Sequence, residues 1–277
     1  MRIAFLMRRP AADGRSITSE VVRLLRDWSV TVDLVHHVAA HPSALADIRP
    51  EHDLYVLRAV NDASLSFAGI LERQGARCLN PVAVSQTCRD KALIAALLAR
   101  TGVPVPDTWL VERPFQLAPA LAEGPLVIKP LHGSQGRGVQ VVWDLDELLE
   151  IGAAGAPVVA QRYQPPQGRD RKLYCIGGQM FGVKRQWPAT TYEQKLGEPF
   201  TITAELHDIA VAVGNAIGTD LFGLDIVISR GQPYVVDVNP FPGFKGVPDA
   251  ALRLADYIYA AAAADVGPLV ARGVVGS

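Results

Sequence analysis

The segment at residues 221–244, LFGLDIVISRGQPYVVDVNPFPGF, constrains the fold of this chain more than any other. It reads as two apolar strands joined by an Arg-Gly turn, and each strand carries an acid where a buried strand favours valine or isoleucine. The first acid is Asp225, and the second strand adds Asp237 and Asn239, two residues apart. Alternate residues of a strand face the same side, so Asp237 and Asn239 point together, and pairing of the strands brings Asp225 beside them.

Three oxygen donors without cysteine or histidine suit a hard cation such as Mg²⁺, which keeps waters and phosphate oxygens as its other ligands. In the alternative interpretation, Asp225 caps a turn and Asp237 lies on an exposed face without a metal. The apolar flanks and the NPFPGF turn weaken that alternative, because a buried charge without a partner is costly. The sequence therefore predicts a metal site at Asp225, Asp237 and Asn239.

The bulk composition limits the class of protein. The 277 residues suffice for two domains or one large domain, and the 49% hydrophobic content supports a sizeable core. A formal net charge of -1 and a pI near 6.6 give no general basic surface for a nucleic acid. Three scattered cysteines without a CxxC pair argue against a disulfide framework or structural zinc. The N-terminus MRIAFLMRRP has the wrong order and length for a signal peptide and favours a first buried strand. The alanine-rich run near Ala260 is too short and interrupted to span a membrane, so a cytoplasmic protein is expected.

The first 85 residues indicate a small open α/β domain with parallel strands. The apolar runs RIAFLM, VTVDLVHHV, DLYVLRAV and ARCLNP predict strands, and SITSEVVRLLRDW predicts a helix. Strand, helix and strand at this spacing are typical of a parallel sheet.

Shorter elements follow. The run SQTCRDKALIAALLARTGVPVP predicts a single amphipathic helix that ends at Gly102 and a proline pair. Short strands are predicted at DTWLV, PLVIKPL, VQVVW and PVVAQRY, and IGGQ predicts a hairpin turn within KLYCIGGQMFGVKR. A helix over residues 203–217 precedes the acid-bearing strand pair, and an alanine-rich helix begins near Pro248.

A glycine-rich loop joins two predicted strands in VIKPLHGSQGRGVQVV. Such a loop can fold over phosphates with backbone N–H groups, and Lys129 at the end of the first strand can place a point charge on a phosphate. The alternative is a plain hairpin, since three glycines alone are weak evidence. The loop is neither a Walker A nor a Rossmann sequence, because the Gly-Lys-Ser/Thr ending is missing and no helix follows at once.

Basic residues on the later strands form another candidate anion-binding surface. Lys172 lies in DRKLYCI, and Lys184 and Arg185 end FGVKR. The alternative is a solvated edge that carries charge against aggregation, which applies most to Lys184. His132 is a lone histidine in a loop, where a surface residue is commoner than a catalyst, and no Ser/His/Asp or Cys/His arrangement supports covalent nucleophilic catalysis.

The chain resembles the ATP-grasp superfamily over most of residues 89–246. The stretches that carry the resemblance are CRDKALIAALLARTGVPVP, LVIKPLHGSQGRGV, VVAQRY, DRKLYCIGGQMFGVKR and LFGLDIVI…YVVDVNPFPGF. Within the superfamily the chain looks most like the RimK-type carboxylate–amine ligases. It is also similar to the inositol trisphosphate 5/6-kinases, which share the DVNPFPGF-like ending. Many ATP-grasp ligases have glutamate where this chain has Asp237.

The resemblance implies an α/β and α+β ATP-grasp fold in three parts. An N-terminal open parallel α/β pre-ATP-grasp domain would occupy residues 1–85, and in such enzymes this region helps to select the acceptor. A small central ATP-grasp subdomain would follow at residues 86–163, and a C-terminal subdomain with an antiparallel sheet at residues 164–277. ATP would lie between the last two parts.

The resemblance also implies a role for each candidate residue. Asp225, Asp237 and Asn239 would hold two Mg²⁺ ions, with Mn²⁺ as an alternative, and Lys172 and Arg185 would be catalytic residues at the transferred phosphoryl group or the acceptor. A loop over residues 132–138 would close over the phosphates, and the hinge at residues 161–163 would read adenine through backbone groups. The implied cofactor-binding residues are Arg89, Lys129, His132, Gly133, Ser134, Gln135, Gly136, Gly138, Gln161, Arg162, Tyr163 and Lys172.

The expected function is an ATP-dependent ligase that joins a small-molecule carboxylate to an amine. The carboxylate attacks ATP to give an acyl phosphate and ADP, and the amine then displaces phosphate to form an amide or peptide bond. One alternative is a kinase for an inositol phosphate or similar polyol, for which Arg8, Arg9 and Arg15 offer a sparse basic cluster. Another is a nucleotide-binding regulatory subunit without turnover. No nucleic acid or membrane partner is expected, and the resemblance allows a homo-oligomer.

Overall fold

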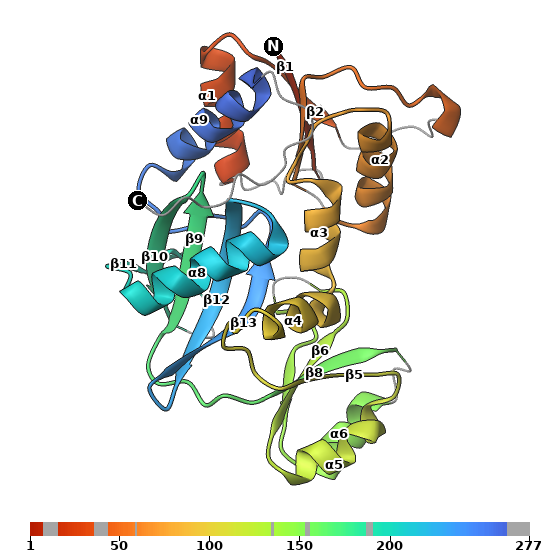
Figure 1. Ribbon diagram of the computed structural model, residues 1–277, viewed down its shortest axis with the longest axis vertical. Helices are drawn as coiled ribbons and strands as arrows, with labels where there is room; N and C mark the ends of the chain where they lie inside the picture. Colours follow the sequence, from red (N-terminus) through yellow and green to blue (C-terminus); the bar gives the residue numbers. More distant parts are fainter. Residues whose placement is uncertain are drawn as a thin grey trace.

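A computed structural model of the 277-residue chain describes residues 1–7, 16–35, 44–58, 60–133, 136–152, 156–186 and 191–264. Three β-sheets lie one after another along the chain, of four, four and five strands. Figure 1 shows the first sheet with its helices at one end of the molecule, the second sheet at the opposite end, and the third sheet between the two ends.

The N-terminal sheet is parallel with the strand order β2-β1-β3-β4, as the apolar runs predict. Apart from the exposed Arg2, its central strands are apolar and buried, because helices and other elements cover both faces of a parallel sheet. The strands and helices are β1 (Arg2–Leu6), α1 (Ile17–Asp27), β2 (Thr31–Val35), the short 3-10 helix η1 (Leu45–Asp47), β3 (Leu54–Leu57), α2 (Asp62–Arg73) and β4 (Cys78–Leu79).

The prediction of one helix after the N-terminal sheet is wrong, because the chain breaks at Asp90. Helix α3 (Val82–Arg89) ends there and α4 (Lys91–Ala99) begins. Asp90 has an extended backbone, and its carboxylate accepts hydrogen bonds from Ala92 N at 3.0 Å and Leu93 N at 2.9 Å. A side chain that caps the new helix in this way competes with continued helix at its own position.

The central sheet is antiparallel with the order β5-β8-β6-β7. Its strands are β5 (Thr108–Val111), β6 (Leu126–Pro130), β7 (Gln140–Val142) and β8 (Val158–Arg162). A 3-10 helix η2 (Pro114–Leu117) and the helices α5 (Ala118–Ala122) and α6 (Leu145–Gly152) close a small core around Leu117, Leu126 and Leu148.

The C-terminal sheet has the order β11-β10-β9-β12-β13 and is antiparallel throughout. The predicted turn between β9 and β10 is confirmed at Gly177 and Gly178, which have positive φ angles of 58° and 82°. Its elements are β9 (Asp170–Ile176), β10 (Gln179–Arg185), α7 (Tyr192–Leu196), β11 (Glu198–Phe200), α8 (Ala204–Ile217), β12 (Leu221–Ser229) and β13 (Gln232–Asn239).

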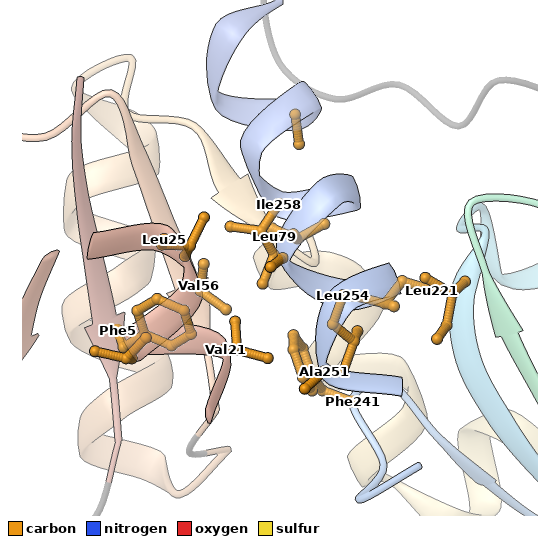
Figure 2. Packing of buried hydrophobic residues seen from close by; sticks show 14 of the residues in the cluster. Phe5, Val21, Leu25, Val56, Leu79, Leu221, Phe241, Ala251, Leu254 and Ile258 are labelled. Carbon is orange, nitrogen blue, oxygen red and sulfur yellow. The ribbon is translucent and has the colours of Figure 1, made fainter. Parts of the chain in front are cut away.

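Strand alternation divides this sheet into two faces with different surroundings. Leu173 and Cys175 pack with α8 in one core, whereas Tyr174 and Ile176 join a core shared with the N-terminal sheet. The last helix, α9 (Ala250–Ala263), lies beside α1, and Figure 2 shows its residues Ala251, Leu254 and Ile258 among side chains of both sheets. The face that holds Tyr174 therefore packs toward the N-terminal sheet and α9.

Candidate functional site

The acid-bearing strand pair forms as the sequence predicts. β12 and β13 are antiparallel neighbours, with Asp225 opposite Asp237 and Gly223 opposite Asn239. Both carboxylates and the amide thus share one face, the face that also carries Tyr174. The premise that these acids are buried is wrong, because 38% of the Asp225 side chain and 41% of the Asp237 side chain are exposed. The strands present the acids at an open surface between core-facing residues.

Each acid is paired with a lysine from another element. Lys172, directly opposite Asp225 on β9, donates to its carboxylate, and Lys91 Nζ lies 2.8 Å from Asp237 Oδ1. Asn239 Oδ1 accepts a hydrogen bond from Phe241 N at 3.0 Å. The sequence analysis missed Lys91, although a cation in the first turn of α4 opposes the helix dipole and is a detectable anomaly.

Lys129 lies at the end of β6, as predicted, and is the most deeply buried cation of the site. Only 8% of the residue is exposed, and its Nζ donates to the Gln161 side-chain oxygen and to Val236 O at 2.9 Å. Burial lowers the pKa of Lys129 to about 8, while the charge of Asp237 acts in the opposite direction. Burial of a charged ammonium destabilises the folded protein, and groups with such a lowered pKa are typical of ligand-binding sites.

A narrow cavity of about 20 Å³ connects Lys129 with Lys91 and Asp237. Its lining combines polar and charged side chains with apolar residues of α4 and β13. Its lining residues are Lys91, Ile94, Ala95, Leu98, Val105, Lys129, Gln161, Val235, Val236, Asp237 and Val238.

Asp170 is a further acid that the sequence analysis did not select. It lies on β9 two residues before Lys172 and therefore on the same face of the sheet. Burial, followed by the charge of Asp225, raises the pKa of Asp170 to about 6. Asp170 and Asp225 are thus close enough for the charge of one to favour the neutral form of the other. The acidic patch therefore extends from the β12–β13 hairpin to β9.

The two basic residues that end β10 point to opposite faces. Arg185 donates to the Tyr174 hydroxyl at 2.7 Å and to Lys245 O at 3.1 Å, on the face of the acids. Lys184 Nζ lies 5.4 Å from the centre of the Phe200 ring, on the other side of the sheet. Arg185 therefore lies on the face of the acids and Lys184 on the opposite face. This placement agrees with the alternative interpretation of Lys184 as a residue outside the anion-binding surface.

The glycine-rich loop lies next to the start of α4. His132 is exposed and forms a β-bridge with Asp90. Gly136 and Gly138 have positive φ angles of 69° and 71°, and a Cβ on Gly138 would lie 2.9 Å from Pro130 Cγ. Glycine is therefore required at the close of the loop. Gly133 is described, and Ser134 and Gln135 lie outside the described residues.

The predicted hinge residues use several of their polar groups within the protein. Arg162 N donates to Asp107 O at 2.8 Å, and Tyr163 N donates to Pro125 O at 3.0 Å. The Arg162 guanidinium binds carbonyl oxygens at the end of α5 and lies 5.2 Å from the Trp109 ring centre. Because these two backbone N–H groups already donate within the protein, adenine would contact carbonyl oxygens of this segment or neighbouring residues.

Arg89 ends α3 and forms an ion pair with Asp62 at the start of α2. The Arg89 guanidinium lowers the pKa of Asp62 through its hydrogen bond and its charge. Arg89 is thus positioned between the N-terminal sheet and the glycine-rich loop. Arg8, Arg9 and Arg15 lie outside the described residues.

The donor chemistry of the acid hairpin fits a divalent cation. Among the described residues no group of three or more histidine, cysteine, aspartate or glutamate side chains could hold a metal. The candidate set therefore depends on the Asn239 amide oxygen beside Asp225 and Asp237. Oxygen-only ligands that are open to solvent leave room for waters and phosphate oxygens, as Mg²⁺ requires. No helix within the described ranges has the length and apolar character needed to cross a membrane.

Comparison with known proteins places this chain in a family. A model described as a RimK-like ATP-grasp domain matches residues 88–261. A probable alpha-L-glutamate ligase from Saccharophagus degradans is 28% identical over 280 residues, which cover 90% of this chain and 91% of that protein. A probable alpha-L-glutamate ligase from Methanococcoides burtonii is 30% identical over 208 residues, covering 68% and 69%.

Solved structures share the whole fold. The RimK domain protein ATP-grasp from Sphaerobacter thermophilus aligns with a TM-score of 0.72 and 21% identity, covering 94% of this chain and 100% of that one. The D-alanine–D-alanine ligase from Bacillus anthracis, complexed with ATP, has a TM-score of 0.72 and 20% identity, covering 95% and 97%. The predicted fold class, with its parallel N-terminal sheet and antiparallel sheets, is confirmed.

Proposed function

The chain belongs to the RimK-like ATP-grasp family, and we propose that it uses ATP to join a small-molecule carboxylate to the amine of an amino acid. It is an ATP-dependent ligase of carbon–nitrogen bonds, as its relatives named alpha-L-glutamate ligase support. The kinase alternative is not favoured, and the family gives no support for a subunit without turnover. The observation that carries the proposal is the single face that presents Asp225 and Asp237 with Lys91 and Lys172 beside buried Lys129.

The reaction brings two anions together, so its residues must supply positive charge. A substrate carboxylate oxygen attacks the γ-phosphorus of ATP, the bond to the β-phosphate oxygen breaks, and acyl phosphate and ADP result. The amine then attacks the acyl carbon and expels phosphate, and the nitrogen loses a proton as the amide forms. Lys129 and Lys91 hold phosphate oxygens in this proposal, and Lys172 and Arg185 stabilise charge on the transferred group.

Asp225, Asp237 and Asn239 would hold two Mg²⁺ ions, which offset the repulsion between the substrate and ATP. Asp170 adds negative charge at the same face. The loop over residues 132–138 keeps water from the acyl phosphate, and no covalent protein nucleophile is needed. The division into residues 1–85, 86–163 and 164–277 is part of the proposal, as is a cytoplasmic location.

The experiment is the release of ADP and phosphate with Mg-ATP against two substrate pools. One pool holds amino acids and small carboxylates, and the other holds inositol phosphates and sugar alcohols. Release of both ADP and phosphate with the first pool, with an amide found by mass spectrometry, supports the proposal. Turnover only with the second pool, without free phosphate, refutes it.

A further inference from the structure

A part-buried arginine without a carboxylate partner lies where the N-terminal sheet faces the acid hairpin. Arg58 directly follows β3, and no aspartate or glutamate among the described residues forms an ion pair with it. Its guanidinium is held by Thr18 Oγ1, which accepts from Nε at 3.0 Å, and by Phe241 O, which accepts from Nη1 at 2.7 Å. Nη2 donates to none of the described residues, so its N–H groups remain available to a ligand.

The position of Arg58 in the sheet is one where ligands bind. The chain leaves β1 toward β2 on one side and leaves β3 toward β4 on the other, so the order β2-β1-β3-β4 reverses between β1 and β3. Ligands of open parallel sheets bind at the carboxyl ends of the strands at such a reversal. Arg58 occupies the carboxyl end of β3 there, and Thr18 lies in the first turn of α1.

Arg77, a second arginine of the same domain, has its positive charge balanced within the protein. Arg77 also lacks a carboxylate, but its guanidinium donates to the carbonyl oxygens of Ala261, Ala262 and Ala264 at the end of α9. The negative end of that helix dipole balances its charge. Arg58 has one carbonyl and one hydroxyl as acceptors, and burial lowers its pKa to about 10, so it stays charged at neutral pH without a carboxylate or a helix end to balance it.

Two hydrogen bonds connect Arg58 to the candidate metal residues through Phe241. Arg58 binds the Phe241 carbonyl, and the Phe241 N–H binds Asn239 Oδ1 at 3.0 Å. The guanidinium is therefore no more than about 10 Å from Asn239, given the span of one residue. The Phe241 ring lies 4.6 Å from the guanidinium carbon and packs beside Ala251 in the shared core (Figure 2), which fixes the arrangement.

We propose that Arg58 binds a carboxylate of the amino-acid substrate that is not consumed in the ligation. This inference rests on the proposed function, which brings an amine and a carboxylate to the hairpin. A guanidinium edge matches the two oxygens of a carboxylate, and an amino acid has the length to reach from Arg58 to the reacting groups. Arg58 thus selects amines that carry a carboxylate over amines that do not.

The test is titration calorimetry of L-glutamate and its two monoamides in the presence of ADP and Mg²⁺, without turnover. The wild type should prefer glutamate over one of the monoamides by about 10- to 100-fold, the range for a charge-assisted hydrogen bond. Arg58→Gln should lose that preference, and Arg58→Lys should keep part of it. ADP affinity should be unchanged in both, which shows that they are folded.

Arg77→Gln is the matched control, because it removes a part-buried arginine of the same domain that lies away from the hairpin. It should keep the wild-type preference even if its melting temperature falls. Wild-type selectivity in Arg58→Gln, or no selectivity in the wild type, overturns the assignment. Selectivity that depends on Arg58 but leads to no amide with Mg-ATP would instead remove the proposed ligation, so the two failures are distinguishable.

Discussion

Replacement of Lys129 by methionine should reveal a conflict between stability and ligand binding at this site. Lys129 is buried, and its pKa falls from 10.5 to about 8 because the folded protein disfavours the charged form. The folded state therefore carries a cost at neutral pH that the unfolded state does not. We expect wild-type stability to rise relative to Lys129→Met as the pH increases from 7 to 10.

The sign and the size follow from proton linkage. Below pH 8 Lys129 is protonated in both states, and between pH 8 and pH 10.5 the unfolded state binds more protons, so the free energy of unfolding rises. The shift corresponds to about 3 kcal/mol in total, of which about 2.5 kcal/mol appears between pH 7 and pH 10. Methionine also loses the hydrogen bonds to Gln161 and Val236, but that cost does not depend on pH.

Urea unfolding at several pH values, followed by circular dichroism, measures the difference between the two proteins. Subtraction removes the titration of all other groups. Lys129→Arg is the control, because a guanidinium stays charged over this range and its stability relative to Lys129→Met should not change. A difference between wild type and Lys129→Met that stays flat from pH 7 to pH 10 would refute the reasoning.

Other predictions concern the same face. Asp237→Ala and Asn239→Ala should each abolish Mg-ATP turnover while near-wild-type circular dichroism shows a folded protein, and full activity in either would remove the metal site. Lys129→Ala should weaken nucleotide binding in calorimetry about 10-fold or more, and an unchanged affinity would count against its phosphate contact. Lys91→Met should raise the KM for ATP, yet lower stability by less than about 1 kcal/mol in urea unfolding, because its partner Asp237 is half-exposed.

The sequence was informative where one local pattern determines position. The two-residue periodicity of a strand places Asp237 and Asn239 on one side. The pairing of Asp225 with Asp237 depends in addition on a register shift between Asp225 and Ile226, which the strand pattern did not predict. The parallel N-terminal sheet and the turn at Gly177 were also predicted from local patterns and are confirmed. The ligase prediction came from the family resemblance and is confirmed by the family match. Site roles such as those of Arg89 and Tyr163 remain predictions.

Residues that depend on long-range packing were missed. Lys91 reaches Asp237 only because Asp90 breaks the helix and turns α4 toward the hairpin, and periodicity alone favoured one continuous helix. Arg58 belongs to a different sheet and meets the hairpin through Phe241, which is 183 residues away in sequence. The exposed fraction of the Asp225 side chain also depends on which elements pack over that face of the sheet. The alternation of residues along a strand does not determine this packing.

The pairing of acids with lysines explains how one face serves both a cation and an anionic nucleotide. Asp225 and Asp237 each bind a lysine, so neither carries an uncompensated charge in the free protein. In the proposed function, the divalent cations take the carboxylates while the phosphates of ATP take Lys91 and Lys172, and every charge exchanges one partner for another. Lys129 differs, since among the described residues its hydrogen-bond partners are an amide oxygen and a carbonyl, and it would gain its first anionic hydrogen-bond partner from the nucleotide. The largest gain in binding free energy per cation is therefore expected at Lys129, whose burial already lowers the stability of the folded state.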